Sequence, residues 1–263
     1  MSKIAPRSIF LFNVVASALA AGAIAFAQPA SPVTRQFDQF GDIQASDLIA
    51  RLDNLAIHLQ EDPQAKTFLI VYRTRRDLPG LSNRYAHRMR SYLTISRGIS
   101  PNRIVTVDGG VAGCLSQELW IVPAGGTAPT PRADASLDSY RGAAYKFDEH
   151  HYVLGDDGYD TYWSEAPADL HSYLEAFAEE LRKHPKSTGY LVAYPSYNRD
   201  RPSVAQTMLR RERNFLIKEL RIKPSQIKTI AGGRREWRTM ELWIAQDREA
   251  ARIIPYNRVT RGK

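Results

Sequence analysis

The chain has 263 residues, a formal net charge of +8 from 36 Lys and Arg against 28 Asp and Glu, and a single cysteine. Hydrophobic residues make up 43% of it, an ordinary share for a soluble protein that excludes a disordered or collagen-like chain, and one cysteine excludes both an internal disulfide and a cysteine-based zinc cluster. The cationic excess favours an anionic partner, and the length fits one or two domains at about 150 residues each.

Residues 1–27 have the pattern of a secretory signal peptide. Lys3 and Arg7 make a basic start, residues 9–27 contain no charge, and Ala25-Phe26-Ala27 ends the stretch as a cleavage motif. An uncleaved membrane anchor is the alternative, because the apolar run is nearly long enough to span a bilayer. We expect cleavage after Ala27, which removes two cations and lowers the net charge from +8 to +6. The mature protein is then expected to be periplasmic or secreted, with no membrane segment and no nucleic-acid partner.

A first module is expected over residues 37–123. Apolar residues in 46–60 recur with a helical period, and the continuous apolar run 68–72 is typical of a central strand. The other expected elements are a strand at 37–43, a helix at 82–96 that ends before Gly98, and strands at 104–107 and 119–122.

A glycine- and proline-rich stretch, 124–146, has the composition of a linker and is followed by a second module over 147–255. We expect helices of this module near 168–183 and 204–220. The first strand and first helix are 12 residues further apart than in the first module, which predicts an insertion near 149–165.

The two modules repeat each other in sequence. Gly109-Gly110, seven residues and Glu118-Leu119-Trp120-Ile121 recur as Gly232-Gly233, seven residues and Glu241-Leu242-Trp243-Ile244. Further anchors recur in the same order, which indicates a duplicated ancestor. The fold class predicted is therefore α/β, an α+β sandwich: two β-α-β-α-β-β modules, each with its helices packed on one face of a mixed sheet.

The helix near 82–96 resembles a helix of the OmpA-like C-terminal domain, a periplasmic module that binds peptidoglycan. The matching residues are Leu81-Ser82-Asn83-Arg84-Tyr85-Ala86, then Tyr92-Leu93, Gly98-Ile99 and Arg103-Ile104, together with Phe-Asp-x-Phe at 37–40. The resemblance spans most of each module and implies the fold, the periplasmic compartment and peptidoglycan as a partner.

The family holds the diaminopimelate group of peptidoglycan with an Asp after the second strand and an Arg on the following helix. In this chain the Asp position falls near Arg75, with Asp77 two residues away, and the Arg position falls on Tyr85, with Arg84 adjacent. The second module has Met208 at the Arg position and Asp200 as a loose candidate for the acid. The resemblance therefore implies at most a modified site, built in the first module from Asp77, Arg84 and Arg88.

Arginines are concentrated around the second strand–helix junction of both modules. Their planar guanidinium groups pair bidentately with carboxylates and phosphates, which favours an anion-binding surface, although a solvated helix face with local ion pairs is an equal alternative. The candidate ligand-binding residues are Arg73, Arg75, Asp77, Arg84, Arg88, Arg199, Arg201 and Arg211.

The insertion contains His150, His151 and several aromatic and acidic residues. We favour a β-hairpin that turns at Asp157-Gly158 with its aromatic residues packed on the domain. A calcium loop, a histidine metal site and a partner contact through Tyr and Trp are the alternatives, but the spacing lacks a calcium-loop pattern and adjacent histidines on a strand point to opposite faces.

Three further features have ordinary interpretations. Glu118 and Glu241 are expected to form cross-strand ion pairs, the Gly-Gly pairs to bend strand ends, and Cys114 to be a free, partly buried thiol, with an intermolecular disulfide as the alternative. No nucleophile–base pair, phosphate loop or metalloprotease motif is present. The sequence thus favours an exported, non-enzymatic binding or scaffold protein without cofactor or metal, in contact with peptidoglycan or an acidic envelope protein. A protein–protein interaction module that has lost glycan binding is the alternative, and a secreted hydrolase is less favoured. The oligomeric state is left open.

Overall fold

The computed structural model describes residues 33–132, 144–154, 160–161 and 171–246, which all belong to one compact unit, Pro32–Lys263. The predicted signal peptide, the middle of the predicted linker and the end of the second module beyond residue 246 lie outside the described residues. No helix in the described ranges has both the length and the apolar character that a bilayer crossing needs.

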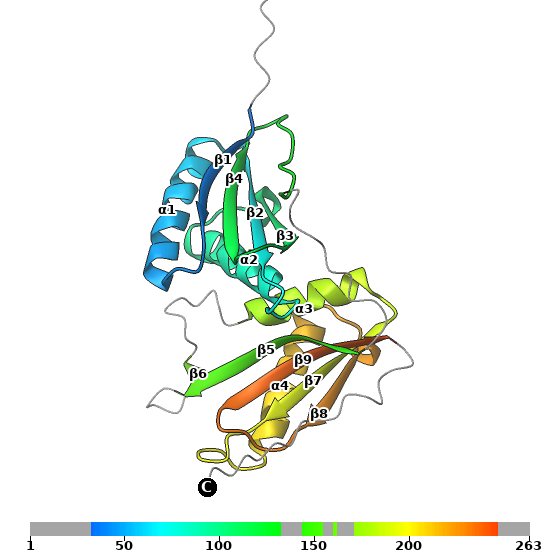
Figure 1. Cartoon of the computed structure of the whole chain (residues 1–263). Coiled ribbons are helices and arrows are strands. Elements are labelled where there is room, and N and C mark those ends of the chain that lie inside the picture. The colour runs from blue at the N-terminus through cyan, green and yellow to red at the C-terminus, as the bar shows by residue number, and fades with distance from the viewer. Residues whose placement is uncertain (1–32, 133–143, 155–159, 162–170, 247–263) are drawn as a thin grey trace, which may run out of the picture. The chain divides into compact units, whose positions relative to one another are not determined.

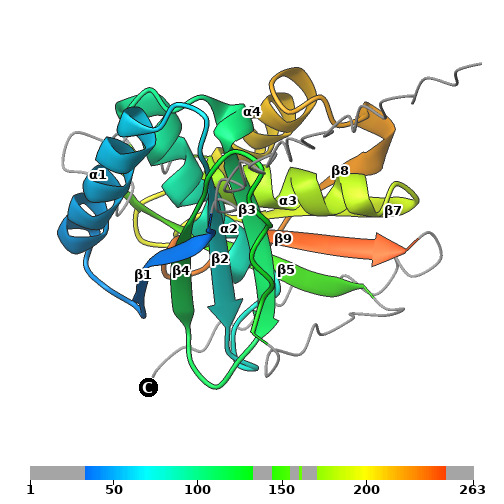
Figure 2. The same cartoon turned by 90° about the horizontal axis from the view of Figure 1, so that it is seen from above.

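Module 1 is a four-stranded mixed sheet with two helices. Its elements are β1 (Arg35–Phe40), α1 (Ala45–Glu61), β2 (Lys66–Arg73), α2 (Leu81–Ser91), β3 (Ile104–Val111) and β4 (Ser116–Val122). The strand order is β1-β4-β2-β3, in which β2 and β3 are parallel and the other pairs are antiparallel, and Figure 2 shows the four strands side by side in that order.

Module 2 repeats this arrangement. Its elements are β5 (Tyr145–Leu154), β6 (Asp160–Thr161), α3 (Ser172–Lys183), β7 (Ser187–Tyr194), α4 (Val204–Lys218), β8 (Ile227–Ala231) and β9 (Arg238–Gln246). The strand order is β6-β5-β9-β7-β8, so that β5, β9, β7 and β8 take the places of β1, β4, β2 and β3 (Figure 1).

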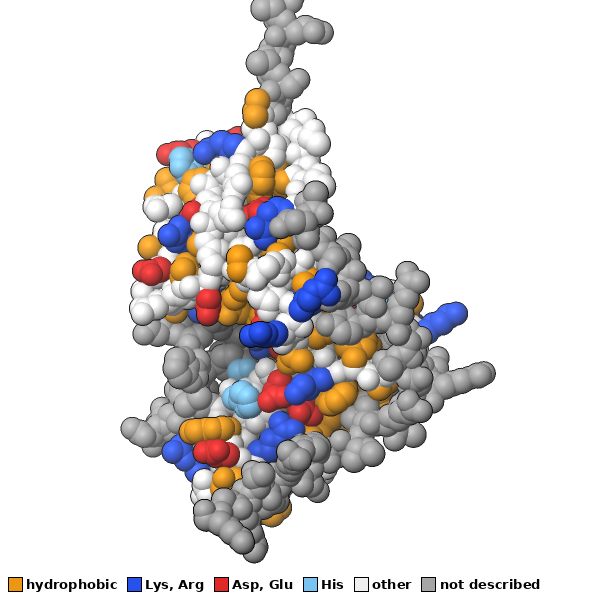
Figure 3. All heavy atoms as spheres, viewed as in Figure 1, with side chains coloured by type: hydrophobic (Ala, Val, Ile, Leu, Met, Phe, Trp, Pro, Cys, Tyr) orange, Lys and Arg blue, Asp and Glu red, His pale blue; other side chains and the backbone are white. Residues whose placement is uncertain are grey.

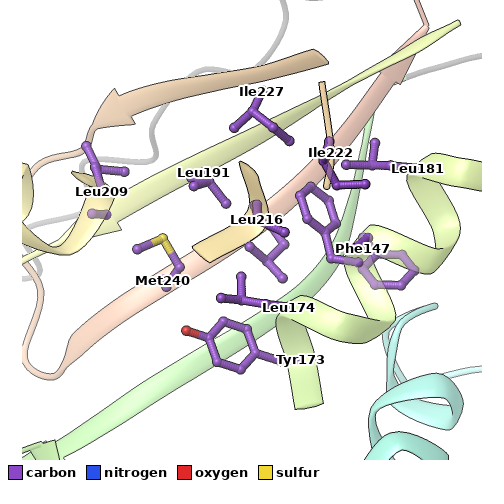
Figure 4. Close-up of a cluster of buried hydrophobic side chains, with 14 of the residues drawn as sticks. Phe147, Tyr173, Leu174, Leu181, Leu191, Leu209, Leu216, Ile222, Ile227 and Met240 are labelled. Atoms are coloured by element: carbon purple, nitrogen blue, oxygen red, sulfur yellow. The ribbon is translucent and has the colours of Figure 1, made fainter. Parts of the chain in front are cut away.

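The helices of each module cover one face of its sheet, as predicted. In α1 the buried residues Leu48, Leu52, Leu55 and Leu59 recur every three or four positions, and they pack against alternate residues of the strands. Figure 4 shows the equivalent core of module 2, where Leu174 and Leu181 of α3 and Leu216 of α4 meet strand residues such as Leu191 and Met240. Burying each such side chain contributes about 1.5–3 kcal/mol to folding.

Most element boundaries differ from the prediction by a few residues. The first strand ends at Phe40 rather than at 43, and the helix predicted over 82–96 is α-helical only to Ser91 and closes with a π-helical turn, Tyr92–Ser96. The predicted start of the first helix of module 2, at 168, lies outside the described residues.

The first strands of the two modules share a local irregularity. The pairing register shifts between Gln36 and Asp38 in β1 and between Lys146 and Asp148 in β5. At each shift the aspartate accepts a hydrogen bond from the next backbone N–H, at 2.8 Å for Asp38 and 2.9 Å for Asp148. A bulge of this kind is a designed feature of a strand, so it supports the predicted correspondence of the two modules.

Candidate functional site

The loop after β2 is held in shape by Asp77. Its Oδ2 atom accepts hydrogen bonds from the backbone N–H of Thr74, at 2.7 Å, and from the Thr74 hydroxyl, at 2.8 Å. The Asp77 carboxylate therefore closes the loop 74–77. Among the described contacts it has none with Arg84, with which it was predicted to form a ligand site.

An open hollow of about 790 Å3 lies between the loop 74–77 and the loop that connects β3 to β4. The exposed side chains of Arg75 and Arg76 line it, and neither guanidinium has a partner among the described residues. Two unpaired guanidinium groups beside an open hollow are suited to bind carboxylates or phosphates bidentately. Arg75 is one of the predicted site residues, whereas Arg76, its neighbour in the sequence, is not among them.

Arg84 lies between the modules rather than in this hollow. Its Nη1 atom is 3.1 Å from Oδ1 of Asp148 and donates to the backbone oxygen of Glu149 at 3.2 Å. Burial raises the pKa of Asp148 even though the Arg84 guanidinium opposes that rise. The contact also depends on Gly80, since a Cβ there would lie 2.6 Å from the ring of Phe147.

The remaining predicted residues of module 1 also lie away from the hollow. The Arg73 side chain is 3% exposed at the end of β2, and Arg88 is half-buried on α2. Tyr85, at the family's Arg position, packs against the core, and burial raises its pKa. Met208, its counterpart in module 2, is also a core residue, so neither module has a guanidinium there.

The corresponding loop of module 2 is held by an ion pair, which the loop 74–77 of module 1 lacks in the described contacts. Asp200 accepts from the backbone N–H of Ser196 at 2.7 Å and from two nitrogens of Arg238 at 2.6 and 3.0 Å. Burial tends to raise the pKa of Asp200, but the hydrogen bonds from Arg238 and Ser196 outweigh it, so the pKa lies below its usual value.

The three predicted arginines of module 2 divide into two groups. Arg199 and Arg201 are exposed beside the loop and have no partner among the described residues. Arg211 instead pairs with the buried carboxylate of Glu212 on its own helix, at 2.7 Å, which matches the alternative of a local ion pair.

The repeated sequence motif forms the same buried cluster on the helix-free face of each sheet. In module 2, Glu241 Oε2 accepts from the Tyr194 hydroxyl and from Nε1 of Trp243, both at 3.0 Å, while Arg235 lies over the Tyr194 ring and donates to Glu241 at 2.7 Å. Lys146 of β5 lies 3.5 Å from the same carboxylate, so Glu241 does form the predicted cross-strand ion pair. Figure 3 shows acidic, basic and histidine side chains gathered over β5 and β9 on this face.

Module 1 builds the cluster with an arginine from a different segment. Glu118 accepts from Nε1 of Trp120 at 3.0 Å and from the Tyr72 hydroxyl at 3.4 Å. Arg132 lies 3.9 Å above the Tyr72 ring and donates its backbone N–H to the Tyr72 hydroxyl at 2.9 Å. The start of the predicted linker is therefore part of module 1. Glu118 Oε1 lies 3.6 Å from Nε of Arg132, so the ion pair of Glu118 is with that segment rather than across strands.

The first glycine of each Gly-Gly pair is explained by this cluster. A Cβ at Gly109 would lie 2.6 Å from Cδ1 of Tyr72, and one at Gly232 would lie 2.6 Å from Cδ1 of Tyr194. Close approach of the tyrosine ring therefore requires these glycines. The predicted bend agrees with the same positions, because the β2–β3 register skips Gly109, Gly110 has a φ of +86°, and Gly232 follows directly on the end of β8.

Replacing Gly232 with alanine is expected to lower the free energy of unfolding by about 1–3 kcal/mol, because the new methyl group overlaps the buried ring of Tyr194. Urea unfolding measures the change. Gly113→Ala is the control, since a Cβ there meets no atom within 4 Å, and its effect should stay within about 0.5 kcal/mol. Equal effects of the two substitutions would contradict the packing role of Gly232.

The insertion in module 2 begins as the predicted hairpin. β5 pairs antiparallel with β6 through Val153 and Leu154, and the turn at 155–159 lies outside the described residues. His150 is half-buried and stacks on Tyr173. Its removal from water lowers its pKa to about 3. His151 lies 3.1 Å from Glu149 and is mostly exposed. In the described ranges no group of histidine, cysteine and acidic side chains is placed to hold a metal ion.

Cys114 differs from its prediction. The thiol is free, as expected, but it is exposed in the β3–β4 loop rather than partly buried.

No family model matches the chain, and no curated protein matches it.

Proposed function

We propose that the chain is an exported, non-enzymatic binding protein of the cell envelope whose first module holds an anionic envelope polymer, with peptidoglycan as the leading candidate. The observation that carries this proposal is the hollow of about 790 Å3 beside the loop 74–77, with the unpaired guanidinium groups of Arg75 and Arg76 at its edge. The hollow is open to solvent, which suits a chain-like ligand better than a small enclosed one.

The fixed loop supports this function. Hydrogen bonds from Thr74 to Asp77 hold the backbone that carries the two arginines, so binding does not have to order it. Peptidoglycan offers carboxylates on its peptide stems, with which an arginine forms charge-assisted hydrogen bonds. The resemblance to OmpA-like domains supports the same ligand, although this chain would bind it through arginines rather than through an Asp and Arg pair.

Sedimentation with insoluble peptidoglycan sacculi tests the proposal. Because charge-assisted hydrogen bonds contribute about 1.5–3 kcal/mol each, we expect the Arg75→Ala/Arg76→Ala chain to bind at least about tenfold more weakly than the unchanged chain. Added salt should weaken binding as well.

The control is Arg210→Ala/Lys218→Ala, which removes two exposed cations from α4 and has the same net charge. Unchanged sedimentation of this control is expected. If both double variants lose the same amount of binding, the net charge of the chain and not the hollow determines binding. If the unchanged chain does not sediment with the sacculi, peptidoglycan is not the ligand.

A further inference from the structure

The end of module 2 that carries Asp200 is a rigid frame. Besides the Asp200–Arg238 ion pair, the backbone N–H of Tyr197 donates to the oxygen of Arg235 at 2.8 Å, and the N–H of Arg235 donates to the oxygen of Pro195 at 3.0 Å. Arg234 donates to the backbone oxygens of Ser196 and Asp200. The β7–α4 loop and the β8–β9 loop are thus held together by side chains and backbone.

This frame presents two large aromatic side chains to solvent. Tyr197, on the β7–α4 loop, and Trp237, on the β8–β9 loop, are each 52% exposed. Among the described residues they are the only exposed large aromatic side chains. Neither side chain takes part in the bonds given for the frame, which join backbone atoms, arginines and the Asp200 carboxylate. Exposed Tyr, Trp and Arg side chains on a rigid support are the composition of a protein-binding hot spot.

A pit of about 80 Å3 lies beside Trp237 and is lined also by Asn198, Arg199 and Glu236. The Arg199 guanidinium, the Asn198 amide and the Trp237 indole N–H have no partner among the described residues. The pit therefore offers several unused hydrogen-bond donors, while its walls contain one carboxylate. Its volume has room for a few water-sized groups, so it accommodates a carboxylate but not a sugar ring.

We propose that this surface, the Trp237 rim (Tyr197, Asn198, Arg199 and Trp237), binds an acidic segment of a protein partner. One Asp or Glu side chain of the partner enters the pit and accepts hydrogen bonds from Arg199, Asn198 and the indole N–H. An apolar neighbour in the partner packs on the exposed rings. The rim lies in module 2 and the proposed polymer site lies in module 1, and the two bind different classes of ligand. Each proposal can therefore fail without the other.

A phage-displayed library of random 12-residue peptides, selected on the full chain, tests the rim. We expect enriched peptides to contain an Asp or Glu next to an apolar residue. Synthetic copies should bind at least about tenfold more weakly to Trp237→Ala and to Arg199→Ala, and replacing their acid with the matching amide should weaken binding similarly.

Arg210→Ala, which removes a cation from α4, and Ile95→Ala, which removes an exposed apolar side chain from module 1, are controls that should bind normally. Enriched peptides without an acid, peptides that bind the rim variants as tightly as the unchanged chain, or no enrichment at all would overturn the proposal. The Arg199 and Trp237 variants should keep sacculus binding, and Arg75→Ala/Arg76→Ala should keep peptide binding, which separates this test from that of the polymer site.

Discussion

Replacing Asp200 with alanine is expected to lower the free energy of unfolding by about 3–5 kcal/mol, because it leaves a largely buried cation without its acid. The side chains of Asp200 and Arg238 are 2% and 13% exposed, and the carboxylate binds two guanidinium nitrogens at 2.6 and 3.0 Å. The substitution also frees the backbone N–H of Ser196. Urea unfolding of the two chains at neutral pH measures the loss.

Asp77→Ala is the matched control in module 1. Asp77 closes the equivalent loop through hydrogen bonds from Thr74 but has no arginine partner that the structure shows, so its loss should cost only about 1–2 kcal/mol. Arg238→Ala in the Asp200→Ala background should recover part of the stability by removing the uncompensated charge. Equal losses for Asp77→Ala and Asp200→Ala would show that loop closure, not the buried pair, determines the effect.

The direction of the pH dependence follows from the lowered pKa of Asp200. A carboxyl whose pKa is lower in the folded protein stabilises the fold above its unfolded pKa and loses that contribution as the pH falls through the folded value. The difference in stability between the unchanged chain and Asp200→Ala should therefore be constant at neutral pH and shrink below about pH 4.

The repeat explains why the sequence predicts the fold well. Gly-Gly and Glu-Leu-Trp-Ile recur at one spacing because each module places a glycine under a tyrosine ring and a glutamate beside a tryptophan. These contacts lie within one module, and the residues that make them occur twice in the sequence. Helical periodicity similarly predicts α1, whose buried leucines are all on one face.

Neither the repeat nor the periodicity predicts contacts that involve a distant segment, such as those between the modules. The sequence suggests Arg84, next to the Arg position of the helix motif that it resembles, as a ligand-binding residue, yet its guanidinium binds Asp148 of module 2. Within each module, the arginine that lies over the buried tyrosine also comes from a different place in the chain. It is Arg132, from the segment after β4, in module 1 and Arg235, from the β8–β9 loop, in module 2. A periodicity or a local motif does not encode a partner that comes from a distant loop. Only the three-dimensional structure distinguishes the arginines that stabilise the fold from those that are free to bind a ligand.

His87 is expected to make the contact between α2 and α3 dependent on pH. Its ring lies 2.8 Å from Oε2 of Glu179 and 3.3 Å from Oε2 of Glu175, and the side chain is 7% exposed. Burial alone would lower the pKa of His87, but the hydrogen bonds with the two glutamates outweigh it, so the pKa is raised. The hydrogen bond with His87, assisted by one from Lys183, lowers the pKa of Glu179 to about 2.

The two shifts define where the contact is strongest. A histidine with a raised pKa stabilises the fold fully below its unfolded pKa, about 6.5, and loses that contribution as the pH rises through the folded value. Glu179 contributes above its unfolded pKa and loses its contribution as the pH falls toward about 2. The contact should therefore be strongest at about pH 4.5–6.5 and weaken on the alkaline side.

His87→Gln isolates this effect, because glutamine keeps a hydrogen-bond donor but cannot take up a proton. Hydrogen bonds to charged groups contribute about 1.5–3 kcal/mol, so the unchanged chain should exceed His87→Gln in stability by about that amount at pH 6, and by much less at pH 9. The measured quantity must be the difference in unfolding free energy between the two chains at each pH. The lowered pKa of His150, about 3, makes the stability of both chains rise with pH, which is opposite to the effect of His87. Arg90 and Arg182 line the hollow beside His87.

His58→Gln is the matched control, because His58 lies 3.3 Å from Glu61 on the surface of α1, with a side chain 45% exposed. Exposed pairs contribute about 0.2–1 kcal/mol, so this variant should follow the unchanged chain closely from pH 6 to pH 9. If His87→Gln differs from the unchanged chain by the same amount at both pH values, the imidazole acts through packing alone. A pH-dependent difference limited to His87 would instead identify its protonated ring as the group that joins module 1 to the two glutamates of α3.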